Sequence, residues 1–376
     1  MFFIFFVFAS IGMFIGTLIF FDPYHIYYLP EKEPLYVDKW GSRKQDAAYI
    51  RHFEFDSFIL GNSYMENTKV SDAESLFGGK FFNLSLSGSN NYERFIVLRD
   101  IFRRHKIKTA IILLSDNVNR GGDYISQWAF LYDRNPFNDI QLYTNSNTIS
   151  FIIKCIIKNE CKWGSKIDFD RPCSWITLPE HNSRLGNIAN WGKYYNNNQL
   201  KELIEIRLPM NVELKPGKFT SPSKNEEKQI DSYLEETFFS IVRQHPETTF
   251  ITYYNPHSRL YRAFQSRDGT LGVYAYWLRK TVELGKNYSN FKIYGFDNLP
   301  FTADMSRYKD LTHYDDKVNS EILHFIKNDI YQLSVNNIDE YIDELRKNAE
   351  LFDIVEINKI IQEAKQETTK SENHKM

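Results

Sequence analysis

The sequence has few cysteines and almost no net charge. Its three cysteines, Cys155, Cys161 and Cys173, have neither zinc-site nor thioredoxin-type spacing, and no histidine pair flanks them at ligand spacing. One disulfide with a free thiol and three reduced thiols are both compatible with this spacing, so the cysteines leave the redox compartment open. The formal net charge is −2, and the basic residues are scattered along the chain. We therefore expect no nucleic-acid partner.

Charge is absent altogether from residues 1–21, which are dominated by Phe, Ile, Leu, Val, Gly and Ala. As a helix, this segment would extend over about 30 Å, the hydrocarbon thickness of a bilayer. It lacks a basic leading region and an Ala-x-Ala-like cleavage site, so we expect an uncleaved transmembrane anchor rather than a signal peptide. A buried core helix is the alternative. By charge alone the body would be cytoplasmic, because the nearest basic residues all follow the anchor: Lys32, Lys39, Arg43 and Lys44.

The rest of the chain has the composition of a globular protein, with 42% hydrophobic and 25% charged residues. Short apolar runs alternate with helical patterns, and the runs lie at 57–60, 80–84, 110–114, 248–254 and 291–296. This alternation predicts an α/β fold with a doubly wound, flavodoxin-like parallel sheet in three layers. Ser71 with Glu74, and Asn90 with Glu93, have capping-box spacing and predict two helix starts.

These patterns divide the chain into four segments. Residues 1–21 are the anchor, 22–54 an irregular juxtamembrane segment, 55–330 the α/β domain and 331–376 a helical C-terminal extension. The alternation stops between about 121 and 217, which we interpret as an insertion on the sheet with one helix near 151–157. The aromatic residues of the insertion are suited either to stacking on sugars or to packing on the sheet: Trp163, Trp175, Trp191, Tyr194 and Tyr195.

Polar residues follow the predicted strands where acyl-transfer chemistry would need them. Ser63 follows the first strand, after a glycine, Gly61, that lets the backbone bend sharply. Gly88 and Asn117 follow the second and third strands, and Asp310 and His313 follow the last. Because the carboxyl ends of parallel strands share one edge of the sheet, we expect these loops to converge.

Each of these residue types has a role in that chemistry. A serine nucleophile needs an adjacent base, histidine can be that base, and a carboxylate orients the histidine. The backbone N–H groups of Ser63 and Gly88, with the amide of Asn117, would stabilise the developing oxyanion.

The same residues resemble the sequence blocks of the SGNH (GDSL-like) hydrolase superfamily, over residues of about 55–120 and 245–330. Gly61-Asn62-Ser63 is similar to the Gly-Asp-Ser block, and residues 83–88 (Asn-Leu-Ser-Leu-Ser-Gly) are similar to the second block. Residues 114–117 stand at the third block, and Asp310-x-x-His313 has the family's spacing. The resemblance implies a triad of Ser63, His313 and Asp310. It also implies Gly88 and Asn117 as oxyanion donors, with Asn90 or Asn91 as the alternative amide.

The wider layout resembles the membrane-linked subset that includes alginate O-acetylation proteins and the D-alanyl transfer protein of teichoic acid. The shared features are the apolar anchor, the Asp-Pro-Tyr after it and the Asn-Leu-Ser-x-Ser-Gly block. This resemblance implies an extracytoplasmic body, periplasmic or at the cell surface, that acts on an envelope glycan, with a membrane-bound acyl-donor partner as one option. It outweighs the charge rule, since large domains translocate largely regardless of flanking charge.

The sequence thus predicts a serine-dependent O-acyl esterase or O-acyltransferase acting on a cell-envelope glycan. A catalytically inactive glycan-binding or scaffold subunit and an esterase for lipid or small acyl esters are the alternatives. We expect no cofactor and no metal site, because Asp116 and Asp123 lack histidine partners at suitable spacing. His181, His245 and His257 are isolated in the sequence and are predicted to be structural or exposed.

Overall fold

The computed structural model describes residues 2–373, except 23, 30–35, 38–41, 145, 159–164, 173 and 196–197. Cys161, Cys173 and Trp163 lie outside the described residues, as does the side chain of Cys155. The alternatives for cysteine pairing therefore stay open.

A five-stranded parallel sheet forms the centre of the body, in the order β3-β2-β4-β6-β7. The strands are β2 (Ser57–Leu60), β3 (Phe81–Asn83), β4 (Thr109–Leu114), β6 (Thr249–Tyr254) and β7 (Phe291–Tyr294). All five lie within a residue or two of the predicted apolar runs, and the α/β class with a parallel sheet is confirmed. A separate two-stranded antiparallel ribbon joins β1 (Tyr36–Val37) to β5 (Ser165–Lys166).

Both faces of the sheet are buried. Ile59, Ile111 and Ile251 stand in register across β2, β4 and β6 and belong to one hydrophobic core. The residues that precede them, Phe58, Ala110 and Phe250, are also in register and belong to the other core. Side chains alternate between the faces of a strand, so a strand buried on both faces needs a continuous apolar run, which is the pattern seen in the sequence.

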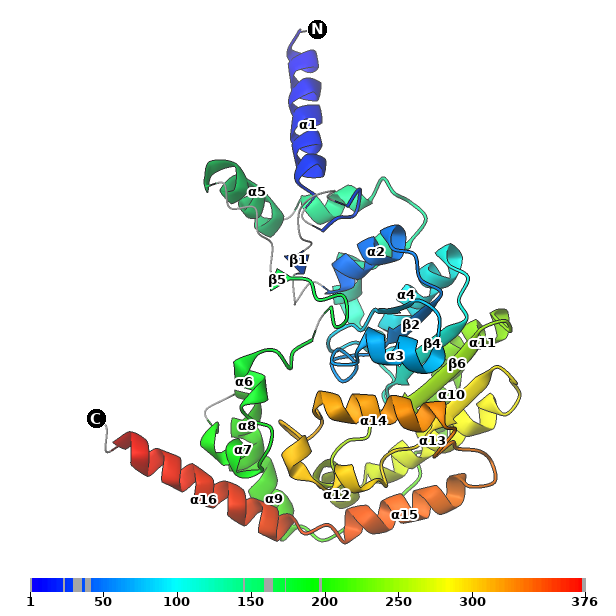
Figure 1. The fold of residues 1–376 in the computed structure, drawn as a ribbon, viewed down its shortest axis with the longest axis vertical. Helices are drawn as coiled ribbons and strands as arrows, with labels where there is room; N and C mark the ends of the chain where they lie inside the picture. The colour runs from blue at the N-terminus through cyan, green and yellow to red at the C-terminus, as the bar shows by residue number, and fades with distance from the viewer. Residues whose placement is uncertain are drawn as a thin grey trace.

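Helices supply the partners for both cores (Figure 1). The first core contains side chains of α2 (Ser42–His52), α4 (Asn91–Arg104), α10 (Lys224–Leu234), α11 (Ser240–Gln244) and α13 (Leu271–Gly285). The second core contains side chains of α3 (Val70–Phe77), α12 (Arg259–Asp268) and α14 (Asp316–Lys327). Asn90 and Glu93 form the predicted capping box of α4.

Two local predictions are wrong. Residues 22–54 are not irregular throughout, because α2 packs Ala47, Tyr49 and Ile50 into the first core. The capping box expected at Ser71 is absent, since α3 already begins at Val70. Asp170 of the insertion accepts hydrogen bonds from two of the free N–H groups at this helix end: its carbonyl accepts from the N–H of Val70 (2.9 Å) and its carboxylate from that of Ser71 (2.7 Å).

The insertion contains more helix than the sequence suggested. The predicted helix is confirmed as α5 (Ser146–Lys158). Shorter elements surround it: η1 (Gly122–Gln127), η2 (Ala129–Tyr132), η3 (Asp139–Tyr143), α6 (Pro179–Asn182), α7 (Ala189–Lys193), α8 (Asn198–Glu202), η4 (Leu203–Arg207) and α9 (Leu208–Glu213).

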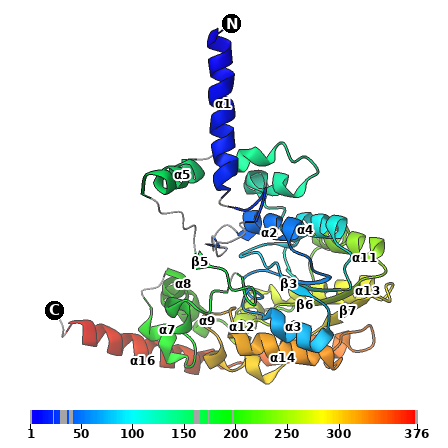
Figure 2. The ribbon, with the colours of Figure 1, turned by 45° about the horizontal axis from the view of Figure 1, so that its top comes forward.

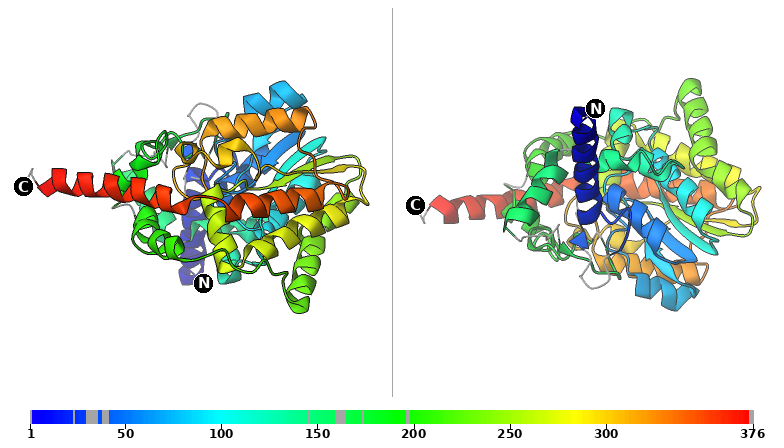
Figure 3. Two further views of the ribbon diagram at one scale, coloured as in Figure 1. Left: turned by 90° about the horizontal axis from the view of Figure 1, so that it is seen from below. Right: turned by 90° about the horizontal axis from the view of Figure 1, so that it is seen from above.

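The C-terminal extension is helical, as predicted, in α15 (Ile338–Glu350) and α16 (Ile354–Asn373). α15 packs on α12 and α13, and α16 packs on α7 and α9 of the insertion. Figure 3 (left) shows both helices on the side of the body remote from α1.

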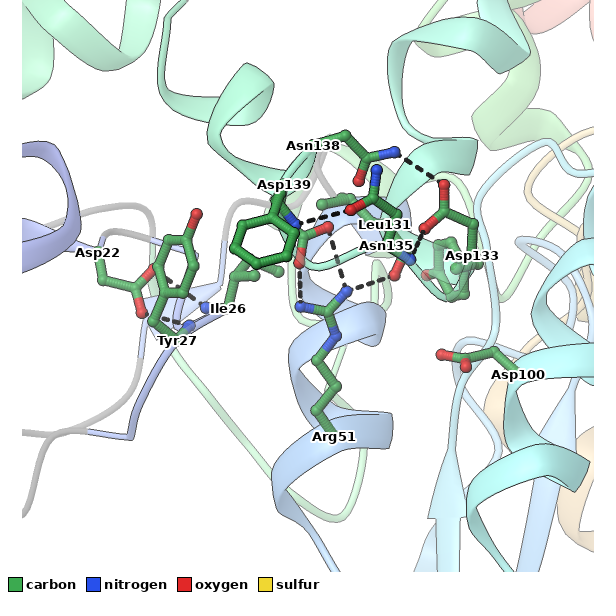
Figure 4. A network of polar contacts seen from close by, with 12 residues as sticks. Asp22, Ile26, Tyr27, Arg51, Asp100, Leu131, Asp133, Asn135, Asn138 and Asp139 are labelled. Carbon is green, nitrogen blue, oxygen red and sulfur yellow. Dashed lines mark hydrogen bonds and ion pairs between the residues drawn. The ribbon is translucent and has the colours of Figure 1, made fainter. Parts of the chain in front are cut away.

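The N-terminal helix α1 (Phe2–Phe21) projects from the body, and it is long and apolar enough to cross a membrane (Figures 1 and 2). Asp22 ties its end to the body. The Asp22 carboxylate accepts the backbone N–H groups of Ile26 and Tyr27 at 3.0 and 2.8 Å (Figure 4). The hydroxyl of Tyr143 in η3 donates to the same carboxylate. The foot of α1 is therefore held by η3 of the insertion.

Candidate active site

Ser63 lies in the turn that follows β2, at the carboxyl end of the strand. Gly61 precedes it, but not for the expected reason, since its φ is not positive. A Cβ at Gly61 would lie 2.5 Å from the Sδ of Met65, so glycine is needed there to make room for that side chain. The carbonyl of Gly61 accepts the N–H of Leu86 (2.9 Å) and the hydroxyl of Ser89 (3.1 Å), which joins this turn to the loop after β3.

Three of the predicted site residues form a connected triad. The Oγ of Ser63 lies 2.8 Å from Nε2 of His313, and Nδ1 of His313 lies 3.0 Å from both carboxylate oxygens of Asp310. Asp310 Oδ1 also accepts the backbone N–H groups of Thr312 and His313, each at 2.9 Å. These bonds fold the Asp310–His313 segment into a tight turn, so the carboxylate fixes both the imidazole and its backbone.

The electrostatic environment keeps Asp310 ionised. Burial alone would raise the pKa of its carboxyl, but His313, Lys309 and the N–H of Thr312 outweigh burial, and the pKa is held well below its ordinary value. An ionised carboxylate at Nδ1 places the imidazole proton on Nδ1. Nε2 is then left free to accept a proton from Ser63.

Trp175 of the insertion completes the surroundings of the triad. Its indole N–H donates to the carbonyl of Ser63 (2.7 Å), and its ring meets the ring of His313 edge-on at 5.7 Å between centroids. The Nζ of Lys309 lies 3.8 Å from the centroid of the same indole. The sequence suggested sugar stacking or packing on the sheet for Trp175, and its contact with the nucleophile turn was missed.

Lys309, which is buried, and His181, which is partly exposed, form a polar pair beside this tryptophan. His181 is not isolated: its Nδ1 lies 3.3 Å from Nζ of Lys309 and 2.6 Å from Nη2 of Arg184. Because two cationic donors point at Nδ1, the ring accepts there and is neutral. Burial and the two cations accordingly lower the pKa of His181 to about 4, and burial lowers the pKa of Lys309 to about 8.

Glu66 is a further buried ionisable group within electrostatic reach of Lys309. Burial raises the pKa of Glu66 to about 8, against the opposing effects of Ser87, Lys309 and Arg43. Ser87 directly precedes Gly88, and its carbonyl accepts Nη1 of Arg43 at 2.9 Å. Glu66 and Arg43 thus both interact with Ser87 in the loop after β3, and the sequence identified neither as part of the site.

The candidate oxyanion donors include the N–H groups of Ser63 and Gly88 and the amide of Asn90. Gly88 has φ +63° and is exposed, and the N–H groups of Ser63 and Gly88 donate to no residue that the structure describes. The Oδ1 of Asn90 caps α4 by accepting the N–H of Glu93 (3.0 Å), which leaves its amide N–H₂ for another acceptor.

The other two candidate asparagines, Asn117 and Asn91, differ in exposure and in hydrogen bonding. Asn117 is exposed and lines a cavity of about 170 Å³ together with Asn62 and Tyr64, which flank Ser63 in the sequence. Asn91 clamps the end of β4 instead, because its amide group exchanges two 2.8 Å hydrogen bonds with the backbone of Ser115. Asn91 therefore commits one of its two amide hydrogens to Ser115, and the candidates stay Asn117 and Asn90.

The rings of His257 and His245 pack against neighbouring aromatic side chains. His257 lines the same cavity, is buried, and packs edge-on against Tyr64 at 5.5 Å between centroids. Burial lowers the pKa of His257 well below its ordinary value, so its ring is neutral. His245 stacks on Phe102 at 4.0 Å.

Comparison of the chain with protein-family models, with curated proteins and with solved structures found no match in any of the three. The chemistry of the site therefore has to follow from its own geometry.

Proposed function

We propose that this chain is a serine-dependent O-acyl esterase or O-acyltransferase of the SGNH type, acting on a cell-envelope glycan through an acyl-enzyme on Ser63. One observation carries the proposal: Ser63 Oγ, His313 and Asp310 form a continuous hydrogen-bonded relay with distances of 2.8 and 3.0 Å. Polar residues meet at these distances in many proteins, but a serine, a histidine and a buried carboxylate in this order are the requirements of acyl transfer.

The fold proposal is a doubly wound, flavodoxin-like domain. Numbered by their order in the main sheet, the strands run 2-1-3-4-5, which is the flavodoxin-like order. Ligands of such sheets bind beyond the carboxyl ends of the strands, and Ser63 lies there.

The mechanism has two half-reactions. Ser63 Oγ bonds to the acyl carbonyl carbon while its proton passes to Nε2 of His313, and collapse of the tetrahedral adduct expels the alcohol, which takes that proton. Water or a sugar hydroxyl then attacks the acyl-enzyme, gives its proton to His313, and the acyl–Oγ bond breaks as Ser63 regains a proton. The N–H groups of Ser63 and Gly88, with the amide of Asn117 or Asn90, stabilise the oxyanion in both adducts.

The acceptor decides between hydrolysis and transfer. An esterase releases the acyl group to water, whereas a transferase must hold a glycan hydroxyl beside the acyl-enzyme and exclude water. For either activity we propose that α1 anchors the body outside the cytoplasmic membrane, where envelope glycans lie. A membrane-bound partner is the proposed source of acyl groups for a transferase.

The inactive glycan-binding or scaffold protein is less well supported. Such a protein has no need to keep a base within proton-transfer reach of a serine, and a Ser63–His313 separation beyond about 5 Å without a bridging water would favour it. The contact of 2.8 Å favours the enzyme instead.

Labelling by a serine-reactive fluorophosphonate tests the nucleophile. The detergent-solubilised full chain should be labelled, Ser63→Ala should not be, and Ser126→Ala, at an exposed serine, should behave like the wild type. Labelling that persists in Ser63→Ala, or a folded wild type that resists labelling, would overturn the proposal. Turnover of an acyl ester, with and without added envelope polysaccharide, then separates hydrolysis from transfer.

A further inference from the structure

Around the foot of α1, the body has a surface with no role in the proposed catalysis. Residues 133–138 connect η2 to η3 on the side of the body from which α1 projects (Figures 1 and 2). α5 lies on the other side of the same foot and contacts α1. These segments would be closest to a membrane crossed by α1.

The loop of residues 133–138 is held rigidly. The carboxylate of Asp133 accepts the N–H of Asn135 (2.6 Å) and the side-chain amide of Asn138 (2.8 Å; Figure 4), and its carbonyl accepts Arg103 (2.8 Å). The N–H of Phe137 donates to Oδ1 of Asn135 at 3.1 Å. Although these hydrogen bonds hold the loop, Phe137 is 87% exposed. A well-supported loop thus presents an aromatic ring to the surroundings, on the side of the body from which α1 projects (Figure 1).

Arginines gather beside this loop. They come from three separate parts of the chain and line two adjoining cavities of about 480 and 550 Å³: Arg51, Arg99, Arg103, Arg104 and Arg134. We call these five residues the arginine cluster. In the sequence they are scattered, so only the packing of α2 against α4 and the return of the chain at Arg134 bring them together.

The acids near the arginine cluster do not balance it. Three carboxylates face the five arginines: Asp100 is fully buried and is shared by Arg103 and Arg104, Asp139 pairs with Arg51 at 2.6 Å, and Asp133 lines both cavities. Within the described part of the chain, Arg99 and Arg134 form no ion pair. Besides burial, the neighbouring arginines lower the pKa of Arg103, which reflects their mutual repulsion. An anion in these cavities would relieve that repulsion, and arginine suits phosphate because its fork donates two hydrogen bonds.

α5 presents a second apolar surface. Ile153 and Ile157 are 48% and 75% exposed and, being four residues apart, share one face of the helix. Lys154 beside them is also exposed. Apolar residues with lysines along one helix are typical of helices that lie in a membrane interface.

We propose that this face rests on the bilayer crossed by α1, with Phe137 and the exposed isoleucines of α5 in the interfacial region and the arginine cluster bound to phosphate groups of anionic phospholipids. The inference rests on the proposed anchoring by α1. It adds a defined membrane-contact surface to the anchor, so the body is oriented on the membrane rather than tethered loosely to it.

Orientation matters for the site because α2 connects the two regions. Arg51, near the end of α2, belongs to the cluster and donates to the carbonyl of Leu131 (2.6 Å; Figure 4). Arg43, near its beginning, donates to the carbonyl of Ser87 beside Gly88. The two arginines are eight residues apart, or about 12 Å along a helix. A body seated on the membrane would therefore hold the loop after β3 at a fixed height above the headgroups.

Depth-dependent quenching tests the seating. The full chains of Phe137→Trp and Leu351→Trp are reconstituted in phosphatidylcholine vesicles that carry lipids brominated near the headgroup. Leu351 is the control because it is exposed between α15 and α16, remote from α1 (Figure 3). Relative to the wild-type background, the added indole at position 137 should lose most of its fluorescence and the one at 351 none. Equal quenching at both positions, or none at 137, would overturn the inference.

Lipid charge tests the arginine cluster. Adding phosphatidylglycerol should increase quenching of Phe137→Trp, and Arg99→Gln with Arg134→Gln should abolish that increase. The matched control, Lys347→Gln with Lys359→Gln, removes two exposed cations from α15 and α16 and should keep it. An increase that survives in the arginine variant would contradict lipid binding by the cluster.

Two further measurements distinguish failure of the membrane-contact surface from failure of the proposed anchor α1 or of the proposed nucleophile Ser63. Vesicles washed with alkaline carbonate should retain the chain, and its release would overturn both the anchor and the seating. Retention with unquenched Phe137→Trp would overturn the seating alone. Fluorophosphonate labelling of the same samples reports on Ser63 and is expected to continue in all these variants.

Discussion

The indole N–H of Trp175 donates to the backbone carbonyl of Ser63 over 2.7 Å. The two residues are more than a hundred positions apart, and Trp175 belongs to the insertion rather than to the sheet. The same indole meets His313 and carries Lys309 on its face. The nucleophile turn, the base and the insertion therefore pack together. A change in how the insertion packs should accordingly change the reactivity of Ser63.

Trp175→Phe is predicted to slow labelling of Ser63. Phenylalanine keeps an aromatic ring beside His313 and Lys309 but removes the donor to the Ser63 carbonyl. A neutral hydrogen bond contributes about 1 kcal/mol, so the rate constant for fluorophosphonate labelling should fall about three- to tenfold. Trp277→Phe makes the same change in α13 and should leave the rate unaltered. An unchanged rate in Trp175→Phe would show that the insertion does not position the nucleophile.

Asp310→Asn is predicted to remove most of the reactivity of Ser63 without unfolding the chain. An amide at this position can donate to Nδ1 and thereby favour the wrong tautomer of His313. Comparable changes in serine enzymes lower the rate by about 10⁴-fold. Labelling rates and thermal melting measured together check this prediction. The control Asp304→Asn, six residues before Asp310, should label at the wild-type rate. A fully reactive Asp310→Asn would exclude Asp310 as the orienting residue.

Gly88→Ala is predicted to lower both stability and reactivity. No atom lies within 4 Å of a Cβ built at Gly88, so the cost comes from the φ of +63°, which is about 1–2 kcal/mol for a residue with a Cβ. Gly186 is a matched control, with φ +86° and equally open space. Both alanine variants should melt at lower temperature, but only Gly88→Ala should label more slowly, because relaxation of the strained φ would turn the N–H of residue 88, the proposed oxyanion donor, away from the adduct. Equal labelling in the two variants would remove Gly88 from that role.

Glu66→Gln is predicted to flatten the pH dependence of stability. The pKa of Glu66 is about 8 in the folded chain, against an ordinary value of 4.5. Between these values the folded chain keeps a proton that the unfolded chain has released, so the free energy of unfolding falls as the pH rises, by at most about 1.4 kcal/mol per pH unit. Glutamine removes this contribution. Urea unfolding from about pH 5 to pH 8 checks it, and the exposed Glu54→Gln should follow the wild type.

The sequence was informative wherever the signal was local. The run in β4 is apolar at successive positions from Ala110 to Leu114, as expected for a strand buried on both faces of a sheet. The helix start at Asn90 was correct because a capping box lies within four residues. At Val70 the same reasoning failed, since Asp170 from the insertion satisfies the helix end that Ser71 was expected to cap.

By itself, the sequence determined the α/β class, the apolar helix α1 and the set of strand-end loops that carry Ser63, Gly88, Asp310 and His313. Periodicity and chain order encode these features, and the carboxyl ends of parallel strands must share one edge. Only the tertiary structure decided which other residues surround the triad and where charge collects. Lys309 contacts Trp175 and lies within electrostatic reach of Glu66, and the arginine cluster forms, because segments far apart in the chain pack together. Neither residue spacing nor composition carries a signal for such packing.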